Sequence, residues 1–274
     1  MLDPFKLPFM QYAAVEIALL APLAGLLGAQ IVLRRLAFYT HSVGAATFPG
    51  LVVAGPAGLP AWLGALTASG IYAALQQRIG RRPGADVATA LLLVTALALG
   101  IVLASDVFNS GAAVDRALFG SLLGIGPEQL RFSAVALGIG LLAALRFRSA
   151  WLVGGFDPAA ARSLGLSSGA DMALVAVVAV AVVASIDAVG SLLVAAILVL
   201  PAATVRPFAS SVGRLELSAA ALALAAGLAG LLLAYELDTP PGPTIAVLGG
   251  VCFALALTLR ALSGRGAAVG GAAA

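Results

Sequence analysis

Few side chains in this sequence could bind a metal ion or transfer a proton, and four of them lie in or beside apolar stretches. They are His41, which is the only histidine, and Asp187, Glu236 and Asp238. A charged group inside a membrane segment costs roughly 2.5–3.5 kcal/mol on insertion scales, so each is a candidate for function. Imidazole suits zinc, copper or iron, and carboxylate suits manganese or magnesium. The four residues therefore predict weak contacts to a passing cation.

The same residues also have structural interpretations. His41 lies between Thr40 and Ser42, a polar group that could cap a helix at the membrane surface. Asp187 could cap a helix at the end of an apolar run, and Asp238 precedes Thr239-Pro240, a sequence typical of turns. Both interpretations remain open at the level of the sequence.

No enzyme motif is found. The string Gly165-Leu166-Ser167-Ser168 matches a loose pattern of intramembrane serine proteases, but no histidine follows it. No glycine-rich phosphate loop is present, so we expect no ATP hydrolysis by the chain itself. One histidine and one cysteine, Cys252, cannot build a closed zinc site. We therefore predict no catalytic residue, no cofactor and no nucleic-acid partner.

A second group of residues carries the signals of a short helix. Asp157 is suited to cap the helix start, Pro158 to occupy its first position, and Gly165 to close it about two turns later. Ala160 and Ala161 would give it a small contact face. We expect this helix to dock on a partner protein.

A third group predicts helix packing and bending. Pro49-Gly50 lies inside one apolar stretch, and Gly190 and Pro201 lie in another. Proline removes a helical hydrogen bond and kinks the helix, whereas glycine lets a neighbouring helix approach closely. We expect Pro201 to shape an inner gate and Gly190 to pack near the outer end of the same span.

The composition indicates the elements that carry these residues. The 274-residue chain is 62% hydrophobic and 10% charged, with a mean hydropathy of +1.10, which excludes an ordinary soluble domain. Because a spanning helix needs about 20 apolar residues, the sequence predicts an all-α polytopic bundle in the cell membrane with about nine spans (eight to ten). The spans are expected near 11–33, 42–59, 60–77, 87–105, 131–146, 170–186, 188–206, 216–235 and 243–262.

The positive charges predict the orientation. Twelve of the 15 lysines and arginines fall on one side of these spans, and Lys6, Arg116 and Arg131 fall on the other. The positive-inside rule places the N-terminus outside the cell. We expect one transmembrane domain over 1–262 and a disordered cytoplasmic tail over 263–274. His41 then lies near the inner face and Asp187 and Glu236 near the outer face, which predicts a path of separate contacts instead of one site.

Five segments resemble the membrane-spanning permeases of metal-ion ABC importers, which carry zinc, manganese or iron. The resemblance covers about 12–262. Its motifs are VLRRLAFYTHSVGAATFPGLVVA (32–54), LFGSLLGIGPEQL (118–130), FDPAAARSLGL (156–166), and the pair VGSLLVAAILVLPAATVRPFA (189–209) and YELDTPPGPTIAV (235–247). The third is similar to the cytoplasmic coupling helix of the family.

The resemblance implies a set of partners and a fold. Two permease copies would form the pathway, a dimer of cytoplasmic ABC ATPases would bind the coupling helices, and an extracytoplasmic metal-binding protein would deliver the ion. The fold would be related to the cobalamin and siderophore importer permeases. The cargo would be a divalent metal ion, with zinc and manganese as the leading candidates. ATP would act only through the partner subunit.

The sequence departs from the family pattern at candidate ion contacts. The family usually has Asp at the position of His41 and His at the position of Ala45, and Asp187 replaces a small residue or Gln. The cargo therefore stays open between zinc and manganese, and the alternatives are an ABC permease of this fold for another solute or a stand-alone secondary carrier. A secondary carrier would show inverted repeats, which we do not find.

Overall fold

The computed structural model describes residues 3–79, 85–107 and 118–270. This part of the chain contains ten α-helices and no strand, so the all-α prediction is confirmed. Short 3-10 or π segments lie at Asp3–Lys6, Leu103–Val107, Leu122–Gly124 and Arg206–Phe208. The α-helices are α1 (Pro8–Leu33), α2 (Ala37–Ala54), α3 (Ala61–Ile79), α4 (Ala85–Val102), α6 (Pro127–Phe156), α7 (Pro158–Ser163), α8 (Ser167–Val189), α9 (Val194–Val205), α10 (Val212–Leu237) and α11 (Pro241–Gly270).

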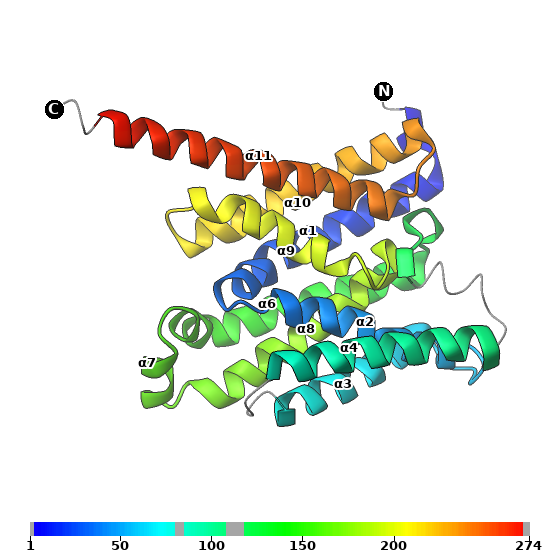
Figure 1. Cartoon of the computed structure of the whole chain (residues 1–274). Helices are drawn as coiled ribbons and strands as arrows, with labels where there is room; N and C mark the ends of the chain where they lie inside the picture. Colours follow the sequence, from blue (N-terminus) through cyan, green and yellow to red (C-terminus); the bar gives the residue numbers. More distant parts are fainter. Residues whose placement is uncertain (1–2, 80–84, 108–117, 271–274) are drawn as a thin grey trace.

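The long helices run roughly side by side and alternate in direction, so that the two termini lie at opposite ends of the bundle (Figure 1). Within the described residues, five helices are long and apolar enough to cross a membrane: α1, α6, α8, α10 and α11. Apolar stretches at Thr89–Ser105 and Val194–Phe208 are shorter. The chain is thus a multi-pass membrane protein, as the composition predicts.

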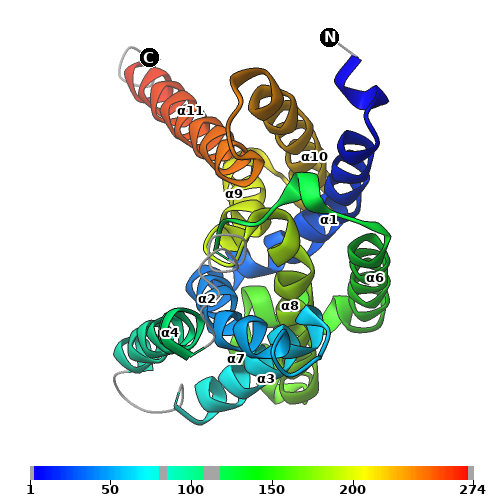
Figure 2. The same ribbon diagram turned by 90° about the vertical axis from the view of Figure 1, so that its right-hand side faces the viewer.

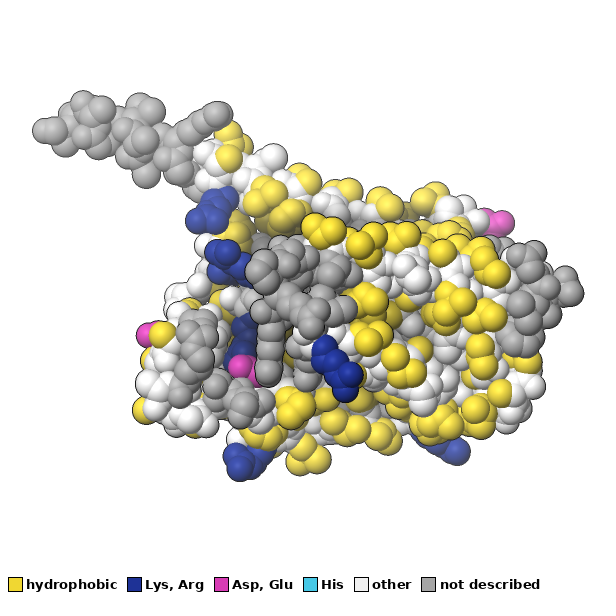
Figure 3. All heavy atoms as spheres, turned by 60° about the horizontal axis from the view of Figure 1, so that its bottom comes forward, with side chains coloured by type: hydrophobic (Ala, Val, Ile, Leu, Met, Phe, Trp, Pro, Cys, Tyr) yellow, Lys and Arg dark blue, Asp and Glu magenta, His cyan; other side chains and the backbone are white. Residues whose placement is uncertain are grey.

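The charged side chains are distributed unevenly along the bundle. The α1–α2, α6–α8 and α9–α10 connections lie together at one end, which we call the arginine-rich end, and they carry Arg34, Arg35 and Arg206. In Figure 3 the Lys and Arg side chains gather mostly toward this end, whereas hydrophobic side chains cover most of the middle of the visible face. Arg81, Arg82 and Arg116, which also enter the orientation argument, lie outside the described residues.

Small residues bring the helices together. A Cβ on Gly25 of α1 would lie 2.6 Å from the Cβ of Ala220 in α10, and a Cβ on Gly227 of α10 would lie 2.6 Å from a methyl of Ile17. Gly50 of α2 and Gly64 of α3 approach each other backbone to backbone. Such close approach is the main attraction available between helices in lipid, where apolar surface gains nothing from burial. Helix α1 lies at the centre of the bundle, where it packs on α10, α9 and α6.

Several helix boundaries differ from the expected spans. The second span was expected at 42–59, whereas α2 begins at Ala37 and ends at Ala54. The fifth was expected at 131–146, whereas α6 continues to Phe156 and includes part of the expected inner connection. At the C-terminus α11 continues to Gly270, eight residues beyond the expected end of the last span. Helices α6 and α11 thus continue beyond the apolar segments that predicted them, whereas α2 is shifted toward the N-terminus.

The expected span 188–206 is divided in the structure. α8 ends at Val189, Gly190 caps it with φ +80°, and α9 begins only at Val194. Gly190 therefore does not lie on the helix of Pro201, and the element that approaches it is the segment 118–120. The Ser121 amide donates to the Asp187 carbonyl at 2.9 Å, and the Leu192 amide donates to the Leu118 carbonyl at 3.3 Å. The segment before α6 thus pairs with the α8–α9 break through its backbone.

Candidate transport path and coupling site

One side of the bundle forms a broad face bounded by two splayed helices. Seen from the end opposite the arginine-rich end, α4 and α11 stand apart, with α2 and α9 between them (Figure 2). α2 and α9 are in contact with each other. Both α4 and α11 expose large apolar side chains along their length, including Leu91, Val94, Val247 and Leu255. This face, which we call the α4–α11 face, is suited to meet lipid or another membrane protein.

His41 lies in the second turn of α2, toward the arginine-rich end, and is half-buried. Phe48, seven residues later, packs its ring against Gly100 of α4. Seven residues are close to two full turns, so His41 and Phe48 lie on the same side of α2. His41 therefore belongs to the side of α2 that is turned toward α4, at the floor of the α4–α11 face.

Asp187 lies in the last turn of α8 and is exposed in the single chain. Its carbonyl accepts the hydrogen bond from Ser121, so its backbone is held by the segment that precedes α6. The acidic pair near the end of α10 is placed differently. Glu236 is exposed in its last turn, and Asp238 follows it as the cap in left-handed conformation, with φ +52°. Asp238 has the turn geometry that the sequence suggested as its structural role.

The structure does not bring these four residues together. Within the described residues, no group of three or more His, Cys, Asp or Glu side chains could hold a metal ion. His41 lies near the start of α2, while Asp187 and Glu236 lie at the far ends of α8 and α10. The arrangement is compatible with separate contacts along a path, and the role of each residue stays a prediction.

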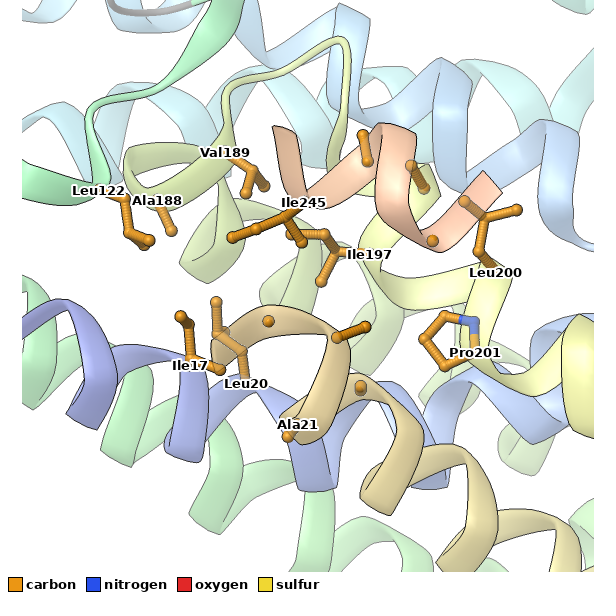
Figure 4. A pocket seen from close by; sticks show the side chains of 16 residues that line it. Ile17, Leu20, Ala21, Leu122, Ala188, Val189, Ile197, Leu200, Pro201 and Ile245 are labelled. Atoms are coloured by element: carbon orange, nitrogen blue, oxygen red, sulfur yellow. The ribbon is translucent and has the colours of Figure 1, made fainter. Parts of the chain in front are cut away.

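Pro201 is buried in α9 and lines a small cavity between α1, α9, α10 and α11 (Figure 4). The cavity has a volume of about 40 Å³ and an apolar lining that includes Ile17, Leu20 and Ile245. It is large enough for about one water molecule, but it offers no polar partner. It is therefore free space beside the proline and not an ion site. Pro49 lies inside α2, and Gly50 packs that helix on α3.

The short helix after α6 has the predicted start and stop. The Asp157 carboxylate accepts hydrogen bonds from the amides of Ala159 and Ala160, at 3.0 and 2.9 Å. Pro158 is the first residue of α7, and Gly165 turns the chain with φ +68°. The helix lies at the arginine-rich end of the bundle (Figure 1).

The contact face expected for this helix is not the one that the structure exposes. Ala161 is only 2% exposed because α7 packs on α6 and α8, and Ala160 is half-buried. The most exposed apolar side chains nearby are Phe156, at 67%, and Leu164, at 64%. A partner would therefore meet Phe156 and Leu164, whereas Ala161 holds α7 against its own chain.

A charged network next to α7 was not identified from the sequence. Arg34, at the end of α1, pairs with Asp171 of α8 and donates to the Trp151 carbonyl of α6 at 3.0 Å. The Trp151 indole in turn donates to the Ala170 carbonyl at 2.8 Å. Three helices are thereby joined at the level of α7. An arginine directly after one apolar run and an aspartate near the start of another are the only sequence signals for this pair.

A second polar contact lies inside the bundle. The Ser133 hydroxyl of α6 donates to the Glu16 carboxyl of α1 at 2.5 Å, and Glu16 is 1% exposed. The second carboxyl oxygen, Oε2, has no hydrogen-bond partner among the described residues. Glu16 lies within the first expected span, 11–33, but the sequence carries no signal for its partner.

Comparisons with known proteins agree with this architecture. Over 259 residues the chain is 29% identical to the chelated iron transport system membrane protein YfeD of Yersinia pestis, with 93% of this chain and 86% of that protein covered. It is 29% identical over 254 residues to the manganese transport system membrane protein MntC of Halalkalibacterium halodurans, with 90% and 86% covered.

Among solved structures, PsaBC from Streptococcus pneumoniae in complex with Fab has a TM-score of 0.84 at 23% identity, with 93% of both chains covered, which supports the fold. The sequence pattern described as the ABC 3 transport family matches residues 6–261, a range that contains nine of the ten helices described and most of α11. The chain therefore belongs to the ABC 3 transport family.

Proposed function

We propose that this protein is the membrane permease of an ATP-driven ABC importer that moves a divalent metal ion into the cytoplasm. The observation that carries the proposal is the match of residues 6–261 to one transport family, whose relatives include proteins named for iron and manganese transport. These names favour manganese or iron over zinc, which the sequence resemblance also allowed. The chain would have no catalytic site of its own.

ATP hydrolysis would take place in a partner ATPase dimer, which α7 would contact. α7 is short, capped at both ends and fixed against α6 and α8, so a force applied to it would reach two long helices directly. Arg34 ties the same region to the end of α1. The exposed Leu164 and Phe156 are the apolar side chains available for the docking contact.

The pathway would form where two copies of the chain meet at their α4–α11 faces. A single copy offers no enclosed polar passage among the cavities described, and the apolar cavity at Pro201 is closed to ions by its size and lining. Pairing two such faces would place α2 with His41 and α9 with Pro201 at the centre of the dimer. An extracytoplasmic binding protein would deliver the ion at the end opposite the arginine-rich end.

The direct test is reconstitution of the full chain in vesicles with its ATPase and its binding protein. We expect uptake of Mn²⁺ or Fe²⁺ that requires ATP and the binding protein, with Zn²⁺ measured in parallel. The matched control is a vesicle whose ATPase cannot hydrolyse ATP. Uptake driven by an ion gradient without ATP would show a secondary carrier, and ATP-driven uptake of a solute that is not a metal would show another importer of the same fold.

A further inference from the structure

Two hollows lie next to each other at the arginine-rich end of the bundle. The first has a volume of about 560 Å³ and is formed by the α1–α2 turn, the end of α6 and the start of α8. The second has a volume of about 370 Å³ and runs between α3 and α8. Both are lined by Val175, so they adjoin at that residue of α8.

The first hollow is positively charged. Its lining includes Arg34 and Arg35, opposed only by Asp171, and the wall at Gly154 and Gly155 carries no side chain. Arg34 is 11% exposed, and its Nε atom is buried without a hydrogen-bond partner among the described residues, although its terminal nitrogens bind Asp171 and the Trp151 carbonyl. Arg35 is exposed and adopts a left-handed backbone, with φ +59°. The exposed Arg35 therefore remains available to an anion, whereas the Arg34 guanidinium is engaged by Asp171 and the Trp151 carbonyl.

The second hollow is apolar and elongated. Small residues on α3, among them Gly70 and Ala73, face Ala176 and Ala179 of α8 across it. Its lining on α8 extends from Met172 to Val180, which is about 12 Å along the helix axis. The groove therefore runs from the charged hollow toward the middle of the bundle, parallel to the helices that cross the membrane.

We propose that these two hollows together bind an anionic phospholipid, with its phosphate at Arg35 in the charged hollow and one acyl chain in the α3–α8 groove. Basic pockets between membrane helices at the surface of the bilayer are suited to anionic head groups. The groove favours a lipid over a free anion, because it provides apolar surface in the direction that an acyl chain takes. The lipid would join α1, α3 and α8 beside the network that holds α7.

The experiment measures lipid binding by the purified full chain in detergent and does not depend on transport. Phosphatidylglycerol and phosphatidylcholine with the same acyl chains are compared by native mass spectrometry. Each basic residue near a membrane surface contributes about fivefold in affinity for an anionic lipid. Arg35→Gln should therefore lower phosphatidylglycerol binding about fivefold, with Arg214→Gln, an exposed arginine at the same end, as the matched control.

The groove has its own matched pair of variants. A Cβ on Gly70 meets nothing within 4 Å, so Gly70→Leu should fill the groove without disturbing the fold. Gly138 of α6 is equally open, and Gly138→Leu should leave lipid binding unchanged. Gly70→Leu should weaken phosphatidylglycerol binding severalfold.

Three results would overturn the proposal. The first is equal binding of the two lipids by the wild-type protein. The second is an equal loss of phosphatidylglycerol binding in Arg35→Gln or Gly70→Leu and in its matched control. The third is displacement of the lipid by millimolar inorganic phosphate with no effect of Gly70→Leu, which would indicate a free-anion site.

Discussion

His41 is the residue whose surroundings bear most directly on the transported ion. It lies on the α4 side of α2, and no other histidine is present in the chain. His41→Ala should lower metal uptake severalfold without changing insertion, because it removes the only imidazole near the proposed path. Uptake in vesicles is the measurement, and Gln11→Ala, at an exposed polar residue near the start of α1, is the control. If metal uptake is unchanged in His41→Ala, the role of this residue is structural.

The Ser133–Glu16 contact makes a prediction about stability. Ser133→Ala removes the only hydrogen-bond donor that the described residues offer to the buried Glu16 carboxyl, and a buried acceptor that loses its partner costs about 1–3 kcal/mol. We expect a lower temperature of thermal unfolding in detergent. Ser105→Ala is the control, since that hydroxyl is exposed and bonds only the Ile101 carbonyl of its own helix. Equal effects of the two substitutions would show that the contact adds no stability.

At the scale of the element, two residues in or next to α7 have different expected roles: Leu164 docks on the ATPase, and Ala161 packs against the protein's own helices. Leu164→Asp should weaken co-purification with the ATPase while thermal stability is kept, because Leu164 is exposed next to α7. Leu237→Asp, an equally exposed leucine at the opposite end, is the matched control. Ala161→Trp should instead lower thermal stability, because its side chain is buried against α6 and α8. Normal ATPase binding by Leu164→Asp would show that α7 is only a linker.

The α8–α9 break can be tested by two glycines that both have a positive φ but differ in their surroundings. Gly58 has φ +67° with open space around it, so Gly58→Ala should cost about 1 kcal/mol of folding free energy. Gly190 has φ +80°, and a Cβ there would collide with the backbone of Leu118 and Gly120. Gly190→Ala should cost at least about 3 kcal/mol from backbone strain and overpacking together. Similar unfolding temperatures for the two variants would contradict the tight packing at this break.

At the scale of the whole molecule, the alternating helices predict which residues share a side of the membrane. With Cys252 replaced by serine, single cysteines are introduced at Ser163, the last residue of α7, and at Ala57 between α2 and α3, both of which are exposed. An impermeant reagent added outside intact cells should label the cysteine at 57 and not the one at 163, because the arginine-rich end is expected inside. The opposite labelling pattern would reverse the orientation and the proposed direction of transport.

The sequence by itself determined the class of the molecule and much of α7. Apolar runs without period-two alternation specify helices in lipid, because only helices and closed barrels satisfy every backbone group there. Asp157, Pro158 and Gly165 are local signals that act on neighbouring backbone groups, so their capping of α7 was readable before any fold was known.

Tertiary structure decided which surfaces face inward and which residues meet. Ala161 and Leu164 lie in the same short segment, but only the packing of α6, α7 and α8 buries the first and exposes the second. The partners of Arg34 and Glu16 lie more than 100 residues away, at Asp171 and Ser133. The division of the expected span 188–206 depends on segment 118–121, whose backbone pairs with residues 187–192. Contacts of this kind carry no local signal, because they arise only when distant helices pack together.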